Sequence, residues 1–263
     1  LQTTQISTFT EFSMKYQNLE PVSAVCMGWG TLFMFEKSRG GDIQLVFCDY
    51  EVNNRKPIFL DTGNQQPVAL FGGLHDAAAI CSDGKIIYIN RDSFRQSPEP
   101  QIAAVSLPSG EKASSVACCY DSVVVLSANG RVFSSPVERI KYTLSFSAVD
   151  ELADQKIVCI SGTNGHCLAL SNDGRVFVRG SNFYGALGLG ESTTSVSSFT
   201  EISSLRGCGI SAVYAGEDHS LFQTRDGKIL ACGRNSNGEL LLSSGSGSNV
   251  YSPIETSFKS EVA

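Results

Sequence analysis

One dipeptide signal recurs along the sequence at long and nearly regular intervals. An Asp-Gly or Asn-Gly pair separates two short apolar runs at Asp83-Gly84, Asn129-Gly130, Asp173-Gly174 and Asp226-Gly227, and Gly40-Gly41 takes the same place in an earlier copy. Such pairs tolerate the positive φ angles of tight hairpin turns. The turns lie 43–53 residues apart, with no helical apolar spacing between them. This pattern predicts repeated antiparallel sheets and argues against a helix-containing solenoid.

The unit is clearest where residues 166–190, HCLALSNDGRVFVRGSNFYGALGLG, are set against residues 219–243, HSLFQTRDGKILACGRNSNGELLLS. The two segments share His, Leu, Asp-Gly, Gly, Asn, Gly and Leu in register without a gap. Earlier copies begin at Val22, Pro67 and Ser114, and every copy predicts three short strands. We expect a fourth strand from the segment that precedes each copy. Such segments lie at 198–203 and at 8–13, and the chain also ends in one at 251–258.

The repeats predict an all-β fold, a β-propeller of four-stranded antiparallel blades in one domain that spans residues 1–263. Five copies favour a closed five-bladed ring, because closure removes the exposed edges of the sheet. Part of a seven-bladed ring is the alternative.

Composition narrows the classes of partner. The net charge of −6 and the pI near 5.1 argue against direct binding to a nucleic-acid backbone, which needs concentrated Lys and Arg. No apolar run is long enough to predict a membrane span. The nine cysteines lack the spacing of a disulfide framework or a metal site, so we expect reduced core thiols and an intracellular protein, cytoplasmic or nuclear. We expect a monomer, with no metal and no cofactor.

The repeat motifs resemble those of the regulator-of-chromosome-condensation (RCC1) repeat family. That repeat has G-x-x-H-[ST], then D-G, W-G-x-N and G-Q-L-G. The chain matches it at 216–219, 226–227, 233–235 and 238–240, and again between His166 and Gly188. The family's Trp before Gly is replaced by Arg179 and Cys232. The founding member has seven blades and binds chromatin through basic elements, which this acidic chain lacks.

The histidine position of the repeat has two interpretations. His75, His166 and His219 each follow a glycine corner, where a polar side chain can hydrogen-bond to the neighbouring blade. The resemblance implies a second role, because acidic and histidine residues at this corner face a Ran-type GTPase in the family's exchange factor. Asp218-His219 alone reproduces the Asp-His pair.

No residue pattern indicates a covalent active site. Residues 185–190, GALGLG, lack the lysine of a phosphate-binding loop, and no nucleophile-elbow sequence is present. We therefore expect a protein-interaction propeller, and its most concrete function would be the regulation of small GTPases. The alternatives are a guanine-nucleotide exchange factor proper for a Ran-type GTPase, and a scaffold or targeting domain with no GTPase role. Nucleotide exchange is a differential-binding problem and needs no nucleophile, so the sequence leaves open whether the protein is an enzyme.

Overall fold

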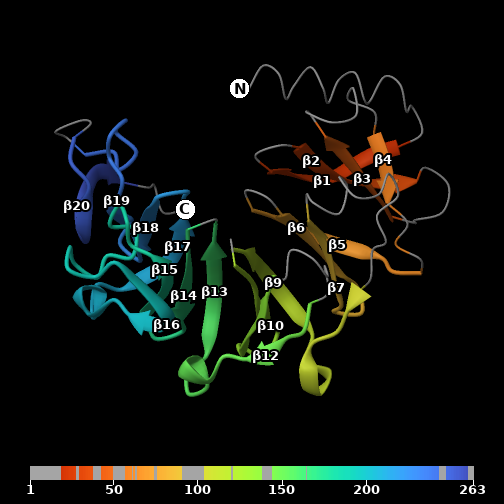
Figure 1. The fold of residues 1–263 in the computed structure, drawn as a ribbon, viewed down its shortest axis with the longest axis horizontal. Helices are drawn as coiled ribbons and strands as arrows, with labels where there is room; N and C mark the ends of the chain where they lie inside the picture. Colours follow the sequence, from red (N-terminus) through yellow and green to blue (C-terminus); the bar gives the residue numbers. More distant parts are fainter. Residues whose placement is uncertain are drawn as a thin grey trace. The chain divides into compact units, whose positions relative to one another are not determined.

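In the computed structural model, the regular secondary structure of the described residues is almost entirely β-strand (Figure 1). It describes residues 19–27, 30–37, 43–49, 57–60, 62, 64–73, 76–90, 104–119, 121–137, 144–163, 165–242 and 247–259. The chain divides into two compact units, Leu1–Val105 and Ser106–Ala263. The single-domain organisation stays a prediction.

The first unit contains two four-stranded antiparallel sheets, and each follows the order of the sequence. One consists of β1 (Leu19–Met27), β2 (Gly30–Lys37), β3 (Ile43–Asp49) and β4 (Pro57–Leu60). The other consists of β5 (Pro67–Gly72), β6 (Asp76–Cys81), β7 (Ile86–Asn90) and β8 (Ala104–Val105).

The second unit contains three further sheets of the same design. Their strands are β9 (Ala113–Cys118), β10 (Ser122–Ser127), β11 (Val132–Pro136) and β12 (Ser147–Ala148); β13 (Ile157–Gly162), β14 (His166–Ser171), β15 (Val176–Ser181) and β16 (Ser195–Glu201); and β17 (Ile210–Ala215), β18 (His219–Thr224), β19 (Lys228–Gly233) and β20 (Val250–Lys259). Short 3₁₀ turns lie at Pro108–Gly110, Asp150–Leu152 and Ser203–Leu205. The prediction of four-stranded antiparallel sheets is confirmed.

The outer strand of each sheet does not come from where the sequence pattern indicated. Segment 198–203 was expected to lead the following copy, but β16 pairs with β15, the strand before it. In the same way β20, which contains residues 251–258, pairs with β19. Each copy therefore takes its fourth strand from the segment that follows it. The expected strand at 8–13 lies outside the described residues.

The recurrent dipeptides lie at the hairpins between the second and third strands of their sheets, except that Gly40-Gly41 is outside the described residues. Gly84, Gly130, Gly174 and Gly227 have φ angles between +81° and +87°. The left-handed conformation falls on the glycine alone, because neither Asp nor Asn at these turns has a positive φ. This is the geometry of a turn that ends in a left-handed glycine, and its twist matches the flanking strands.

The hairpin glycines also allow one sheet to approach the next closely. The backbone amide of Ile157, the first residue of β13, donates to the Gly130 carbonyl at 2.9 Å. A Cβ atom on Gly130 would lie 3.0 Å from the Ile157 carbonyl oxygen. The repeated Gly thus serves both the turn and the packing of consecutive sheets.

The core of the second unit lies between consecutive sheets. Strand β14 is buried along its whole length and divides its side chains between two clusters. Cys167 and Ala169 pack with residues of β9–β11, whereas Leu168 and Leu170 pack with Phe222 and other residues of the last sheet. Successive strand residues point to opposite faces, so β14 joins both neighbouring sheets into one unit.

Candidate functional site

His166 lies at the start of β14 and links two sheets through a buried hydrogen-bond chain. Its ring is 2% exposed, and its Nε2 lies 2.7 Å from the Ser220 hydroxyl on β18. The Ser220 hydroxyl donates to the Ala186 carbonyl, also at 2.7 Å. A hydroxyl has one hydrogen to donate, so Ser220 accepts from His166, and the histidine hydrogen sits on Nε2.

This tautomer leaves the Nδ1 atom of His166 as a bare acceptor. Nδ1 is buried and has no hydrogen-bond partner. Burial, reinforced by the nearby His219, lowers the pKa of His166 to about 4, since a charged ring in this position would be poorly solvated. The ring is therefore neutral at physiological pH. Its position favours the structural interpretation over direct contact with a partner.

The hairpin register defines the equivalents of His166 in the other sheets. The residue eight positions before the turn glycine is His219 in the last sheet, Ser122 in the third and Asp76 in the second. His75 therefore precedes this position, and it lies outside the described residues. Asp76 is buried and accepts a hydrogen bond from the Asn90 side chain at 2.7 Å.

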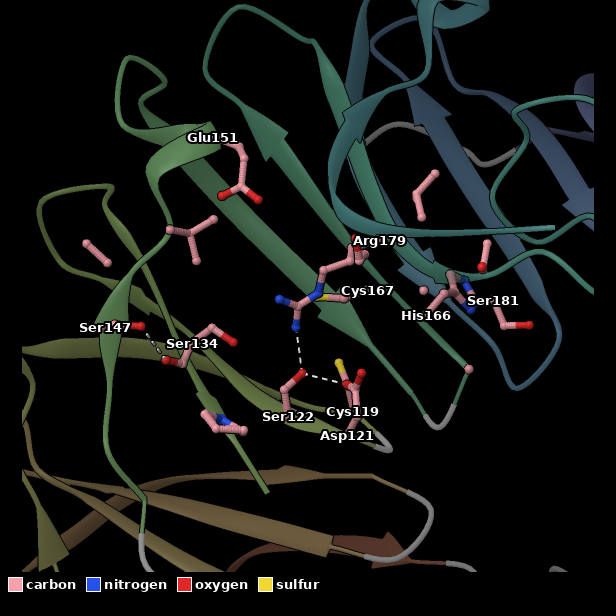
Figure 2. A pocket seen from close by; sticks show the side chains of 18 residues that line it. Cys119, Asp121, Ser122, Ser134, Ser147, Glu151, His166, Cys167, Arg179 and Ser181 are labelled. Atoms are coloured by element: carbon pink, nitrogen blue, oxygen red, sulfur yellow. Dashed lines mark hydrogen bonds between the residues drawn. The ribbon is translucent and has the colours of Figure 1, made fainter. Parts of the chain in front are cut away.

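Ser122 repeats the cross-sheet role of His166. Its hydroxyl accepts from the Arg179 guanidinium on β15 at 2.5 Å (Figure 2). Two positions of this register, His166 and Ser122, thus bond to side chains of the next sheet. Arg179 and Ser220, which supply the partners, were not predicted as site residues. One feature of the sequence could have drawn attention to Arg179, which stands where the RCC1 repeat has Trp.

Asp218 and His219 stand at the β17–β18 corner of the last sheet. The Asp218 carboxylate forms an ion pair with Arg234, with Oδ2 and the guanidinium nitrogen 3.4 Å apart. Arg234 also faces Glu239 at 3.6 Å. The His219 ring is half-buried against Gly216, where an added Cβ would lie 2.2 Å from the ring. Burial lowers the pKa of His219, and the carboxylates of Glu239 and Asp218 oppose that shift.

Two aromatic residues adjoin this ion pair. The Arg234 guanidinium lies 5.4 Å from the centroid of the Tyr184 ring. Tyr184 makes an edge-to-face contact of 4.9 Å with Phe183, which is 74% exposed. Both rings come from the loop between β15 and β16, and neither residue was predicted as a site residue. We call Phe183, Tyr184, Asp218, His219, Arg234 and Glu239 the Asp218 corner.

In the part of the chain that the structure describes, no three His, Cys, Asp or Glu side chains gather as metal ligands, and no helix is long and apolar enough to cross a membrane. The seven cysteines with described side chains are free, and five of them are buried. Burial raises the pKa of the Cys232 thiol.

Comparison with family models decides what the repeat is. Models described as the regulator of chromosome condensation (RCC1) repeat match residues 157–186 and 210–239, and residues 173–223. These residues carry RCC1 repeats. The resemblance expected from the His, Asp-Gly and Gly-x-Asn motifs is thus confirmed for these residues.

Known proteins are similar to this chain over limited stretches. A secretion-regulating guanine nucleotide exchange factor of Bos taurus is 43% identical over 81 residues, which are 31% of this chain and 17% of that protein. A probable E3 ubiquitin-protein ligase of Homo sapiens, HERC6, is 34% identical over 166 residues, which are 60% of this chain and 16% of the ligase. The chain thus spans less than a fifth of either relative.

Solved structures show the fold. Human WBSCR16 superposes with a TM-score of 0.71 at 16% identity, covering 90% of this chain and 66% of that one. Prp20p of Saccharomyces cerevisiae, described with its binding to Gsp1p and histones, gives 0.71 at 14% identity, covering 96% and 66%. The predicted all-β propeller class is confirmed. The number of blades in a complete ring stays a prediction.

Proposed function

We propose that this chain is a protein-interaction propeller and that the Asp218 corner is its partner-binding surface. The carrying observation is the exposed Phe183 ring beside a partly exposed Asp218–Arg234 ion pair. Aromatic and arginine side chains supply much of the binding energy at protein interfaces. A rigid sheet that presents such residues on loops suits recognition better than covalent chemistry.

Regulation of a small GTPase is the most concrete form of this proposal. The similarity to a secretion-regulating guanine nucleotide exchange factor supports it, as does the fold shared with a protein described as binding Gsp1p. Exchange would require Asp218 and His219 to bind the nucleotide-free GTPase more tightly than the loaded form. Two alternatives stand beside it: exchange-factor activity proper toward a Ran-type GTPase, and a scaffold role like that of a binding segment in a larger ligase.

The proposal also covers the cellular location, oligomeric state and partners of the protein. We place it inside the cell, in the cytoplasm or nucleus, because its described cysteines are free thiols. We further propose a monomer that contacts protein partners and does not bind nucleic acid directly, because its net charge of −6 would repel a phosphate backbone.

A stopped-flow assay tests the GTPase proposal. Release of a labelled nucleotide is measured from Ran-, Rab- and Arf-type GTPases at micromolar concentrations of the full chain. We expect acceleration for one of them, and a loss of about tenfold with Asp218→Ala, because one charge-assisted contact is worth roughly 1.5–3 kcal/mol. The melting temperature should change by no more than about 2 °C, since an exposed ion pair contributes little stability.

Asp154→Ala is the matched control, because Asp154 is exposed in the turn before β13. If the chain accelerates nucleotide release from none of these GTPases, the proposed regulation of a small GTPase is refuted. Affinity capture with the wild type, Asp218→Ala and Phe183→Ala then tests the broader proposal. Identical retained proteins in all three captures would exclude the Asp218 corner as the binding surface.

A further inference from the structure

A pocket whose lining includes charged and hydroxyl side chains lies between two consecutive sheets of the second unit, distinct from the Asp218 corner. It has a volume of about 660 Å³, which is in the range of small-ligand sites. Its lining comes from the sheet of β9–β12 on one side and from β14–β16 on the other (Figure 2). Among the described residues, six of its lining side chains are serines: Ser122, Ser134, Ser147, Ser181, Ser195 and Ser197.

Arg179 is the cation of this pocket. It extends from β15 toward β10 (Figure 2), where it donates to Ser122 at 2.5 Å. Its guanidinium lies 5.3 Å from the centroid of the Phe199 ring, which supports the side chain from β16. A guanidinium carries five N–H donors, and this is the one hydrogen bond that it donates among the described residues. The remaining donors are available to a ligand in the pocket.

Two carboxylates flank Arg179, and each accepts hydrogen bonds from groups other than Arg179. Asp121 accepts from the Ser122 hydroxyl at 2.8 Å. The carboxyl of Glu151 has its pKa lowered chiefly by its own backbone amide and by the Ser198 hydroxyl, with a smaller effect of Arg179. Figure 2 shows Glu151 and Asp121 on opposite sides of the guanidinium. Neither forms an ion pair with Arg179 in the described part of the chain.

Acceptors also line the pocket beside Arg179. The Asp121 and Glu151 carboxylates and the six serine hydroxyls belong to its lining. The lining therefore offers a guanidinium to an oxyanion, and offers acceptors to donors beside it.

We propose that this pocket binds an oxyanion, a carboxylate or a phosphate, carried on a polypeptide segment of a partner. Arg179 pairs with the oxyanion in the two-pronged manner that suits a guanidinium. The serine hydroxyls bind the remaining oxygens, and Asp121 and Glu151 accept from backbone N–H groups next to it. A free inorganic anion has no such N–H groups, so the flanking carboxylates select against it.

The experiment is a titration of the full chain, followed by NMR, with four probes. These are N-acetyl-glutamate N-methylamide, its glutamine analogue, N-acetyl-phosphoserine N-methylamide and inorganic phosphate. We expect saturable shifts of the Arg179 side-chain and Ser122 signals with the capped glutamate or the capped phosphoserine. Whichever of the two binds more tightly identifies carboxylate or phosphate as the natural group. The glutamine analogue should bind at least about tenfold more weakly, because it lacks the charge-assisted pair.

Variants assign the binding to Arg179. Arg179→Gln should weaken it about tenfold, and Arg179→Lys a few-fold, because lysine keeps the charge and loses the planar fork. Arg225→Gln, on the exposed β18–β19 turn, should leave it unchanged. If Arg179→Gln does not fold, Ser122→Ala replaces it, with a few-fold loss expected from the misoriented guanidinium.

Four results would overturn the proposal. They are no saturable binding of either charged capped probe, equal binding of the glutamine analogue, an equal effect of Arg225→Gln, or inorganic phosphate binding as tightly as the capped probes. The last result would indicate an adventitious ion only.

Discussion

His166 shows how a residue that looked like a site residue acts within the packing of two sheets. The Ser220 hydroxyl has given its hydrogen to Ala186, so it can only accept from the ring. The ring must stay neutral to keep Nδ1 unprotonated in an apolar environment. The stability of the folded state therefore depends on the protonation of His166, and so on pH.

We predict that stability falls between pH 6.5 and pH 4. The unfolded chain protonates His166 near pH 6.5, whereas the folded chain does so only at about pH 4. Because the unfolded state binds more protons in this window, acidification favours unfolding by up to about 3 kcal/mol. Above pH 6.5 the contribution is fully present. Urea unfolding at pH 5.0 and 7.5 measures the effect.

Two variants control this prediction. His166→Gln should flatten the pH dependence, and His219→Gln should change it less, because His219 is only half-buried. An unchanged slope in His166→Gln would show that other groups carry the dependence.

The loop between β15 and β16 is organised by one buried asparagine. The Asn182 amide nitrogen donates to the carbonyls of Gly190 and Thr193 at 3.1 and 2.7 Å. Its oxygen accepts from the Leu187 amide at 2.8 Å. In the next sheet the oxygen of Asn235 accepts from the Leu240 amide in the same way. The Asn of the repeat thus satisfies backbone groups of a long turn.

We predict that Asn182→Ala lowers the free energy of unfolding by about 2–4 kcal/mol, because it leaves buried donors and acceptors without partners. Asn237→Ala is the control, since Asn237 is exposed in the equivalent loop of the last sheet, and it should cost less than about 0.5 kcal/mol. Chemical denaturation compares the two. Equal losses would contradict the assigned role of Asn182.

At the scale of the whole molecule, the two core clusters of the second unit are built, among the described residues, from that unit alone. All their members lie between Ala117 and Val250. Repeat architectures derive stability from each unit and from its nearest neighbours, so these clusters can form without residues 1–105.

We therefore predict that residues 106–263, expressed alone, keep a strand-rich circular dichroism spectrum and unfold cooperatively on heating. Residues 106–209, which lack the last sheet and with it one wall of β14, are the comparison and should unfold at a lower temperature. If residues 106–263 are unfolded in isolation, the stability of the sheets depends on the full chain, as a single domain would require.

The sequence alone determined the parts that depend on local conformation. Gly at the hairpins, alternating burial and the spacing of the copies predicted antiparallel sheets, because φ preferences and strand periodicity act over a few residues. It also identified the RCC1 repeat. Only the tertiary structure decided which sheet each outer strand joins, since the chain between strands permits either partner. The same holds for the Arg179–Ser122 and His166–Ser220 contacts, whose members are far apart in sequence and meet only because consecutive sheets pack together.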